Sequence, residues 1–494
     1  MTDAARADLQ KRYAEAVVLH QQGRLREAED IYRGIIDRAP DHADAIHHLG
    51  VIAFQAGHPR DAIDIIRDSV RINPRNAAAY SNLGLAYERC GRYDEAVASY
   101  DRALELKPAY PDALYNRGNA LRERGDLEAA LASYDAALAQ HPGYVEAQVN
   151  RGRALRELGR PADAIAAYDA ALALKPGFAP ALLNQAFARL VTGDYARGLP
   201  QFEARWQEQQ PAGARRSFPA PWWDGSEPVA GATVFLYAEQ GIGDTLQFCR
   251  YAPLLAARGA RVVLEVQQPL VSLMQSLAGV AAVIPAGAPL PAMDFHCPLP
   301  SLPLAFATTV ETIPAGAAYL GADPQRVADW QERLGPRRHG GAGRRIGLVW
   351  SGNAAFLNDR QRSLTLGQLE PLLTADADIV CLQKELREDD VERYRARADR
   401  IRFFGDALED FADTAALTAC MDLVVSVDTA GAHLAGALGR PLWLLLPYAP
   451  DWCWLLERAD SPWYPTARLF RQRAPREWAG VLQEVRAALD AGSA

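Results

Sequence analysis

The sequence predicts an all-α array of helical repeats followed by an α/β region made of two similar halves. The first observation behind this is a 34-residue period that runs through the first 206 residues. The second is an alternation of short strand-like runs with helical stretches, which begins at Gly231 and restarts after Arg344. The third is the stretch from Asp422 to Pro441, whose pattern is strand, tight turn and helix.

The repeats share residues at fixed positions. Glycine and proline recur every 34 residues, at Gly50, Gly84, Gly118 and Gly152 and at Pro40, Pro74, Pro108, Pro142 and Pro176. This spacing is the tetratricopeptide period. Alanines recur where the two helices of a repeat must approach closely, at Ala28, Ala62, Ala96, Ala130 and Ala164. Large side chains are expected to fill the space between neighbouring repeats, at Tyr32, Ile66, Tyr100, Tyr134, Tyr168 and Phe202.

Five repeats and a sixth, degenerate one are therefore expected within residues 1–206. Helix pairs of this kind stack into a superhelix whose concave surface usually holds a peptide or protein. Asparagine recurs on the first helix of successive repeats, at Asn82, Asn116, Asn150 and Asn184. An amide both donates and accepts, so a row of them suits a peptide backbone whatever its side chains. The alternative, that these amides bond to the neighbouring helix, is equally compatible with the sequence.

Residues 207–230 are expected to form a linker or docking segment, because they are rich in proline and glycine. The pair Trp222 and Trp223 within it is expected to pack against a domain face rather than to stack on a sugar.

The first α/β half is expected at residues 231–335. Its predicted strands are 233–238, 261–266, 281–285 and 294–298. Gly241 and Gly243 follow the first strand and allow the backbone to turn close to a ligand. They lack the full GxGxxG arrangement, so no dinucleotide cofactor is implied. Asp244 then begins a helix, either as a structural cap or as a general base facing a bound hydroxyl.

The second half is expected at residues 345–494, with strands at 346–350, 378–383, 402–405, 423–428 and 442–446. Two such halves in tandem create a cleft, with ligands at the carboxyl ends of the strands. Ser351 and Asn353 follow the first strand, and Gln383 ends the second. Arg360 and Arg362 lie ahead of the first helix, where either can pair with phosphate oxygens. The alternative for each arginine is a surface ion pair.

The stretch after the fourth strand of this half predicts an anion site. Asp428, Thr429, Ala430 and Gly431 form a turn of small residues before a helix that stops at Gly439. Unpaired N–H groups and the helix dipole favour an anion there, and small side chains let a phosphate approach. A nucleotide diphosphate fits this description. The alternative is that Asp428 or Thr429 only caps the helix.

Composition excludes several classes of function. The N-terminus has no apolar signal-peptide core and no apolar run is long enough to span a membrane, so a cytoplasmic protein is expected. The six cysteines lack CxxC spacing, which disfavours a zinc site and a disulfide framework. A formal charge of −8 disfavours nucleic acid as the main partner.

The chain from Gly231 onward resembles a GT-B glycosyltransferase similar to the lipopolysaccharide heptosyltransferases. Three segments carry the resemblance: GIGDTLQF at 241–248, NDRQRSL at 358–364 and VDTAGAHLAGALGRP at 427–441. The resemblance implies that Asp244 is the base on the acceptor hydroxyl and that Arg362 is the basic residue at the phosphates. It also places Asp428, Thr429, Ala430 and His433 on the donor-diphosphate motif. This chain departs from the pattern with Arg362 where lysine is usual and with Ala430 where glycine is usual.

A repeat superhelix joined to a GT-B domain also resembles O-GlcNAc transferase and bacterial flagellin glycosyltransferases. That resemblance implies a protein acceptor gripped by the asparagine row and a single, inverting transfer from a nucleotide-sugar. No metal or other cofactor is expected, because no DxD-type site is evident. Two alternatives stay open: a scaffold with an inactive transferase fold, and a glycan-assembly transferase that the repeats only recruit.

Overall fold

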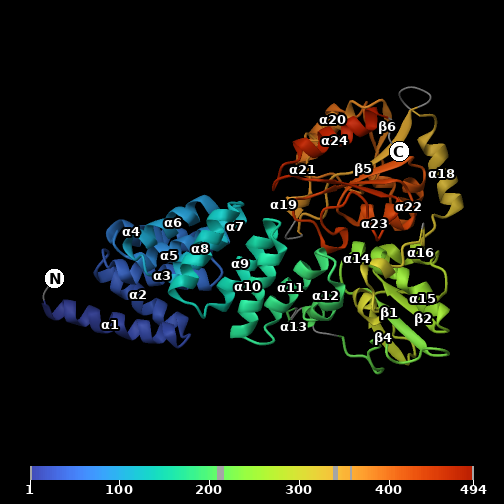
Figure 1. Cartoon of the computed structure of the whole chain (residues 1–494). Coiled ribbons are helices and arrows are strands. Elements are labelled where there is room, and N and C mark those ends of the chain that lie inside the picture. The colour runs from blue at the N-terminus through green and yellow to red at the C-terminus, as the bar shows by residue number, and fades with distance from the viewer. Residues whose placement is uncertain (1–2, 209–215, 317, 338–342, 356–358, 492–494) are drawn as a thin grey trace. The chain divides into compact units, whose positions relative to one another are not determined.

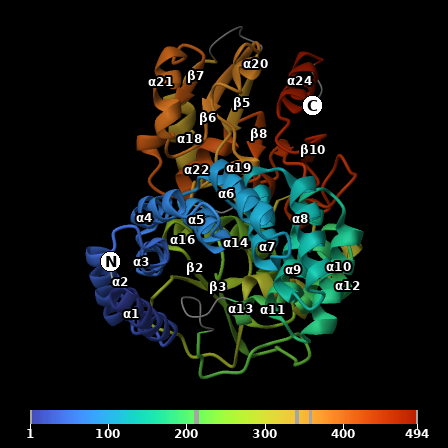
Figure 2. The ribbon, with the colours of Figure 1, turned by 90° about the vertical axis from the view of Figure 1, so that its left-hand side faces the viewer.

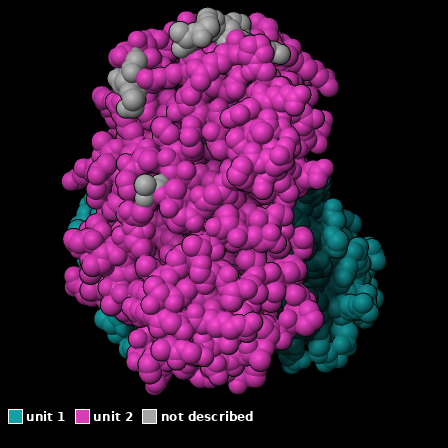
Figure 3. Space-filling model, turned by 90° about the vertical axis from the view of Figure 1, so that its right-hand side faces the viewer, with its two compact units in different colours: residues 1–181 teal, residues 182–494 magenta. Residues whose placement is uncertain are grey.

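The computed structural model describes residues 3–208, 216–316, 318–337, 343–355 and 359–491. The chain divides into two compact units, Met1–Ala181 and Leu182–Ala494 (Figure 3). Within the described residues, no helix is both long and apolar enough to cross a lipid bilayer.

The first unit consists of antiparallel helix pairs, which succeed one another in Figures 1 and 2. The pairs are α1 (Asp3–Gln21) with α2 (Leu25–Arg38), α3 (Ala43–Gln55) with α4 (Pro59–Ile72), α5 (Ala77–Arg89) with α6 (Tyr93–Leu106), α7 (Pro111–Arg124) with α8 (Leu127–Gln140), and α9 (Val145–Glu157) with α10 (Pro161–Leu174). The loops between the helices of a pair contain glycines with positive φ, such as Gly125 at 101°. A side chain is strained in that conformation, which explains glycine at these turns. The predicted all-α superhelix is confirmed.

In the third, fourth and fifth helix pairs the repeated glycine contacts the repeated tyrosine ring of the same pair. A Cβ atom on Gly118 would lie 2.5 Å from a ring carbon of Tyr134, and one on Gly152 would lie 2.4 Å from Tyr168. Tyr134 also donates its hydroxyl to Asn119 in the same repeat. The rings were expected to fill the space between neighbouring repeats. Tyr32 does so, since its ring stacks on His48 of the next repeat. Tyr100, Tyr134 and Tyr168 also lie on the glycine of their own helix pair, because only glycine lets the first helix approach the ring so closely.

Gly118→Ala is expected to lower the free energy of unfolding by about 2 kcal/mol, because the new methyl overlaps the Tyr134 ring. Gly34→Ala is the matched control. Gly34 lies within α2 and its Cβ would meet no atom within 4 Å. Since alanine is the better helix former, this change should stabilise the chain by about 0.5–1 kcal/mol. Thermal or urea unfolding measures both, and equal effects of the two changes would contradict the close-contact role.

The sixth, degenerate repeat belongs to the second unit. It comprises α11 (Ala179–Val191), α12 (Tyr195–Phe202) and the short α13 (Arg205–Glu208). The predicted repeat array, residues 1–206, therefore continues from the first unit into the second, because the chain divides between Ala181 and Leu182. The reason is packing, since Tyr195, Leu199 and Phe202 join the large hydrophobic core of the α/β region. Trp463 also donates its indole N–H to the Tyr195 hydroxyl at 3.1 Å.

The first α/β half contains a four-stranded parallel sheet in the order β3-β2-β1-β4. The strands are β1 (Thr233–Tyr237), β2 (Arg261–Val266), β3 (Val280–Pro285) and β4 (Phe295–Pro298). Helix α14 (Ile242–Phe248) follows β1, and a 3₁₀ turn leads into α15 (Ala252–Ala257). Short helices α16 (Val271–Met274) and α17 (Leu302–Ala305) follow β2 and β4. The order reverses at β1, which places a switch point between β1 and β4.

The second half is a six-stranded parallel sheet in the order β10-β9-β8-β5-β6-β7. Its strands are β5 (Arg344–Val349), β6 (Ala377–Cys381), β7 (Ile401–Phe403), β8 (Leu423–Val427), β9 (Leu442–Leu446) and β10 (Ala467–Arg471). Its helices are α19 (Asp359–Arg362), α20 (Glu370–Leu373), α21 (Glu388–Ala396), α22 (Phe411–Ala419), α23 (Ala430–Ala437) and α24 (Ala479–Asp490), and α18 (Pro324–Leu334) precedes the sheet. The order is doubly wound, with its switch point between β5 and β8. The parallel α/β expectation for this region is confirmed.

The described part of the predicted linker adds to the first sheet. Trp222 forms an isolated parallel bridge with His296 of β4, and Trp223 is fully buried. The indole N–H of Trp223 donates to the Glu227 carbonyl at 3.0 Å, and its ring meets Phe306. The pair packs on the face of the first half. Residues 209–215 of the predicted linker, like Asn358 of the NDRQRSL segment, lie outside the described residues.

Candidate functional site

The carboxyl ends of β5 and β8 bring together the turns on which most of the predicted donor-binding residues lie. Trp350, Ser351 and Gly352 follow β5, and Asp428 and Thr429 follow β8, its hydrogen-bonded neighbour. This is the switch point, where two connections leave in opposite directions and open a crevice for a ligand. In Figure 1 the first half is green to yellow and the second is orange to red; α14 and α23 lie side by side where the halves meet.

Arg362 is directed at the turn after β8. One of its terminal nitrogens donates to the Asp428 carbonyl at 2.9 Å. A Cβ on Gly352 would lie 2.9 Å from another terminal nitrogen of Arg362 and 3.3 Å from the Thr429 methyl. A larger residue at position 352 would therefore displace the Arg362 guanidinium from this turn. A guanidinium beside the N-terminus of α23 gives this turn two kinds of anion-binding group.

Arg360 lies on the same short helix, α19. Its side chain is exposed, whereas that of Arg362 is only 20% exposed. Of the two arginines considered from the sequence, Arg362 contacts the switch-point turn, through its bond to the Asp428 carbonyl.

Gln383 holds the loop after β5. Its side-chain oxygen accepts from the backbone N–H groups of Trp350 at 2.7 Å and Ser351 at 3.0 Å. Its amide nitrogen donates to the Ser351 hydroxyl at 3.1 Å. Asn353 is exposed and accepts from the backbone N–H of Ala355. Gln383 and Ser351 are thus placed together, and Asn353 makes a local turn at the edge of the loop.

Three residues that sequence reasoning did not single out complete this loop: Asp359, Ser363 and Arg387. Arg387 donates to the Gly352 carbonyl at 2.9 Å, to the Ser363 hydroxyl at 3.1 Å and to the Asp359 carboxylate. Ser363 in turn donates to Asp359 at 2.7 Å and accepts from the Gly352 N–H at 3.0 Å. Asp359 is buried, and the positive charge of Arg387 compensates its negative charge. Nothing in the sequence pairs residues 28 apart, and only the fold brings them together.

His433 lies on the second turn of α23 as a buried neutral ring. Its Nδ1 is 2.9 Å from the Tyr464 hydroxyl, and its Nε2 is 3.9 Å from a carboxylate oxygen of Asp428. The ring stacks on Trp454. Burial, together with the positive charges of Arg250 and Arg362, lowers the pKa of His433 to about 3. The neutral ring therefore positions the turn and does not add positive charge to it.

Asp244 approaches this site from the first half. It lies on α14, which packs against α23; a Cβ on Gly243 would be 3.1 Å from the His433 ring and 3.7 Å from the Ala430 Cα. One carboxylate oxygen of Asp244 accepts from the Gly241 N–H at 3.0 Å. Burial raises the pKa of Asp244 to about 7, and the negative charges of Asp451 and Asp428 act in the same direction. Asp244 is thus both a helix cap and a carboxylate that gains and loses a proton near neutral pH.

Asp451 is a third acidic residue of this site, and sequence reasoning missed it. It precedes a 3₁₀ turn at Trp452–Trp454 and accepts from the Cys453 N–H at 3.2 Å. Its negative charge acts on both Asp244 and Asp428. Burial raises the pKa of Asp428 to about 7, Asp451 adds to the shift, and Arg362 opposes it. The acidic residues therefore share a site with the anion-binding turn, which gives that site groups for proton transfer.

Asp428→Asn is expected to stabilise the chain at pH 8 by about 4 kcal/mol. The pKa of Asp428 is about 7 in the folded chain, above the ordinary value of 3.8 for an aspartate. Between these values the folded chain binds more protons than the unfolded chain, so stability falls as pH rises. Asparagine removes that penalty, and the two proteins should be equally stable near pH 4. Unfolding curves between pH 4 and 8 measure this, and an unchanged difference across that range would contradict it.

The amides of the asparagine row point to the preceding repeat at two positions. Asn82 Nδ2 is 2.9 Å from His47 Nε2. Asn150 Nδ2 donates to the Tyr115 hydroxyl at 2.9 Å and to Asn119 Oδ1 at 2.8 Å. Asn116 and Asn184 are half-buried on α7 and α11. The inter-repeat bond is therefore present at Asn82 and Asn150, and peptide binding by the row stays a prediction.

Within the described residues, no three His, Cys, Asp or Glu side chains are grouped as a metal ion would need. Metal independence of the site stays a prediction.

Comparison with known proteins identifies the repeats. The tetratricopeptide repeat family matches residues 13–77, 47–113, 82–145, 115–179 and 149–214. These residues contain tetratricopeptide repeats, as the period predicted. FlbA of Caulobacter vibrioides is 27% identical over 327 residues, which cover 61% of this chain and 53% of FlbA. The chain thus spans about half the length of that curated relative.

Two solved structures are similar to the repeat part. PilF of Pseudomonas aeruginosa is 18% identical, with a TM-score of 0.38 over 42% of this chain and 95% of PilF. YrrB, described as a TPR protein with an unusual peptide-binding site, is 19% identical, with a TM-score of 0.32 over 36% of this chain and 93% of YrrB.

Proposed function

We propose that the chain is a metal-independent GT-B glycosyltransferase that moves a sugar from a nucleotide-sugar to a protein hydroxyl held by the repeats. The observation that carries the proposal is the meeting of α14 and α23. It sets Asp244, with a pKa near 7, against a turn that presents Arg362 and the α23 N-terminus. A general base on one side and an anion-binding turn on the other are what sugar transfer requires.

The proposed reaction is a single displacement. Asp244 takes the proton of the acceptor hydroxyl, whose oxygen bonds to the anomeric carbon of the sugar. The bond from that carbon to the diphosphate oxygen breaks, and the nucleoside diphosphate leaves with the electron pair. Attack opposite the leaving group inverts the anomeric centre. Arg362 and the N–H groups at the start of α23 stabilise the negative charge that develops on the diphosphate.

A protein acceptor is the class that the repeats favour. Tetratricopeptide repeats present a concave surface that typically binds peptides or proteins. Within the described residues, five such helix pairs lie in the first unit, ahead of the α/β region. We therefore assign to the repeats the role of presenting a Ser or Thr hydroxyl of a partner protein.

The test is thermal stability with the nucleotides UDP, GDP, ADP and CMP. A ligand that binds only the folded chain stabilises it by about 2.7 kcal/mol at 100 times its Kd. One nucleoside diphosphate should raise the melting temperature of the wild type. Arg362→Ala should abolish that shift, whereas Arg360→Ala, an exposed arginine two residues away, should keep it. No shift with any nucleotide would favour the non-catalytic scaffold.

Labelled transfer then separates a protein acceptor from a glycan acceptor. With the donor class known, label that accumulates on protein supports the proposal. Label that accumulates on a lipid-linked sugar would favour the glycan-assembly alternative, in which the repeats only recruit the enzyme.

A further inference from the structure

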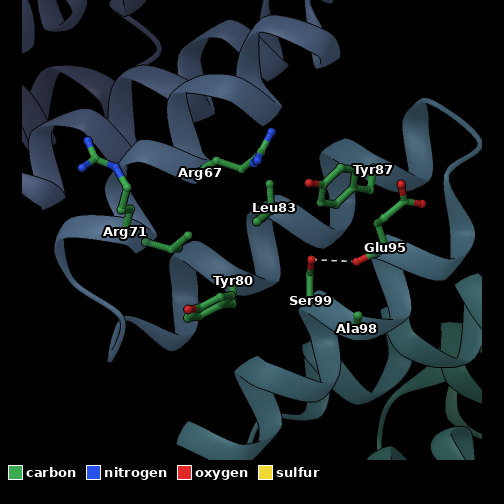
Figure 4. A pocket seen from close by; sticks show the side chains of 9 residues that line it. Arg67, Arg71, Tyr80, Leu83, Tyr87, Glu95, Ala98 and Ser99 are labelled. Carbon is green, nitrogen blue, oxygen red and sulfur yellow. Dashed lines mark hydrogen bonds between the residues drawn. The ribbon is translucent and has the colours of Figure 1, made fainter.

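The first unit contains a groove between helices α4, α5 and α6, with a volume of about 420 Å³ (Figure 4). This volume lies in the range of ligand-binding pockets. Its apolar lining includes Val70, Leu83, Tyr80 and Tyr87. Its charged lining consists of Arg67, of Arg71, which pairs with Asp68, and of Glu95, which pairs with Arg92. None of the predicted asparagines lines it.

The 34-residue period allows a comparison with the same place in the next two repeats. Arg67, Leu83 and Ser99 line the groove from α4, α5 and α6. One period later these positions are Asp101, Arg117 and Ser133, and two periods later the first two are Asp135 and Arg151.

In those later repeats an arginine bridges the helices. Arg117 donates to Asp101 at 2.6 Å and to the Ser133 hydroxyl at 2.7 Å. Arg151 donates to Asp135 at 2.6 Å. The arginine comes from the first helix of a repeat, and the aspartate comes from the preceding helix.

At the groove both residues of this ion pair are replaced by other residue types. Leucine replaces the bridging arginine, and an arginine replaces the aspartate. Within the described residues no carboxylate lies within ion-pair distance of Arg67, an exposed side chain. The other arginines around the groove have partners, since Arg71 pairs with Asp68, Arg92 with Glu95 and Arg102 with Glu105.

We propose that this groove binds a peptide segment of a partner protein in which a carboxylate side chain lies beside an apolar one. The carboxylate pairs with Arg67, as Asp101 pairs with Arg117 one repeat later. The apolar side chain lies on Leu83 and Val70, between the two tyrosines. The faces of those tyrosines are partly covered by arginines, since Arg92 stacks on Tyr87 and Arg102 lies over Tyr80.

Charge complementarity favours this occupant over others. A basic peptide would bring a second cation to Arg67. A wholly apolar segment would cover Arg67 without pairing it, which costs free energy. The groove uses none of the residues of the proposed transferase reaction. A negative result for peptide binding would therefore leave the transferase proposal standing, and the reverse also holds.

The decisive variant restores the bridge of the later repeats. Arg67→Asp combined with Leu83→Arg recreates the pair seen at Asp101–Arg117, so the helices should pack as before and the groove should close. Its circular dichroism and melting temperature are expected to match the wild type within a few degrees. A random nonapeptide display library is selected on the full wild-type chain, with counter-selection on this closed variant.

The expected result is enrichment of peptides with Asp or Glu beside an apolar residue. A selected peptide should bind the closed variant at least tenfold more weakly in fluorescence anisotropy, and Arg67→Ala about fivefold more weakly. Changing its acidic residue to the amide should cause a similar loss. Arg33→Ala is the matched control, since Arg33 holds the equivalent place one repeat earlier and pairs with Glu29. Enrichment without acidic residues, or equal binding by the closed variant, would overturn the proposal.

Discussion

Asp244→Asn is expected to lower sugar transfer by about 10²- to 10⁴-fold, the range that a general base contributes. Nucleotide binding should be unchanged, because the donor turn belongs to the other half. The fold should also persist, since an asparagine oxygen can accept from the Gly241 N–H as the carboxylate does. A low transfer rate together with intact nucleotide binding would show that Asp244 acts as the general base and does more than cap its helix.

The pH dependence of the wild type tests the same assignment. The pKa of Asp244 is about 7, and a base acts only when deprotonated. The transfer rate should therefore rise about tenfold per pH unit below 7 and level off above it. A flat profile between pH 5 and 8, or an Asp244→Asn enzyme with more than a tenth of the activity, would refute Asp244 as the base.

Arg205→Met is expected to destabilise the second unit by about 3–5 kcal/mol, the cost of leaving buried charges without their partner. Arg205 is 1% exposed and donates to Glu239 at 2.9 Å, to Glu203 at 2.8 Å and to the Ser301 hydroxyl at 2.7 Å. Glu239 lies two residues before Gly241. Arg205 therefore joins the last repeat helices to the loop that carries Asp244.

A double variant and a control make this prediction specific. Arg205→Met with Glu239→Gln should recover part of the lost stability, because it removes one of the two stranded carboxylates. Arg197→Met should cost about 0.5 kcal/mol or less, since Arg197 is 71% exposed and pairs with Asp194 at the surface. Urea unfolding measures all three. A loss for Arg205→Met no larger than that for Arg197→Met would show that the buried network is unimportant.

The strands of the two halves could be predicted closely because each is a short apolar run between polar turns. β2 (Arg261–Val266) and β9 (Leu442–Leu446) have the predicted bounds. β10 (Ala467–Arg471) was missed because arginines interrupt it, and it lies at the sheet edge, where alternate side chains meet solvent.

The candidate site was predictable only where its residues are close in sequence. The turn from Asp428 to Gly431 could be identified because small residues follow a buried strand. Arg387 could not, since it lies in a highly charged segment that resembles a solvated surface, and Asp451 could not, since it lies in an aromatic segment far along the chain from the turn. Arg360 and Arg362 were indistinguishable until the short helix fixed which side chain faces Asp428.

The sequence by itself determined the repeats and the parallel α/β region, because the 34-residue period and the apolar runs are local patterns with local causes. Tertiary structure alone decided that the last repeat helices belong with the α/β region, where Tyr195 and Phe202 find a core. It also decided which charges meet. An ion pair such as Arg205–Glu239 depends on how elements distant in the sequence pack together. The pKa of Asp244 also depends on that packing, because burial and nearby charges set this pKa, and the residues beside Asp244 in the chain do not.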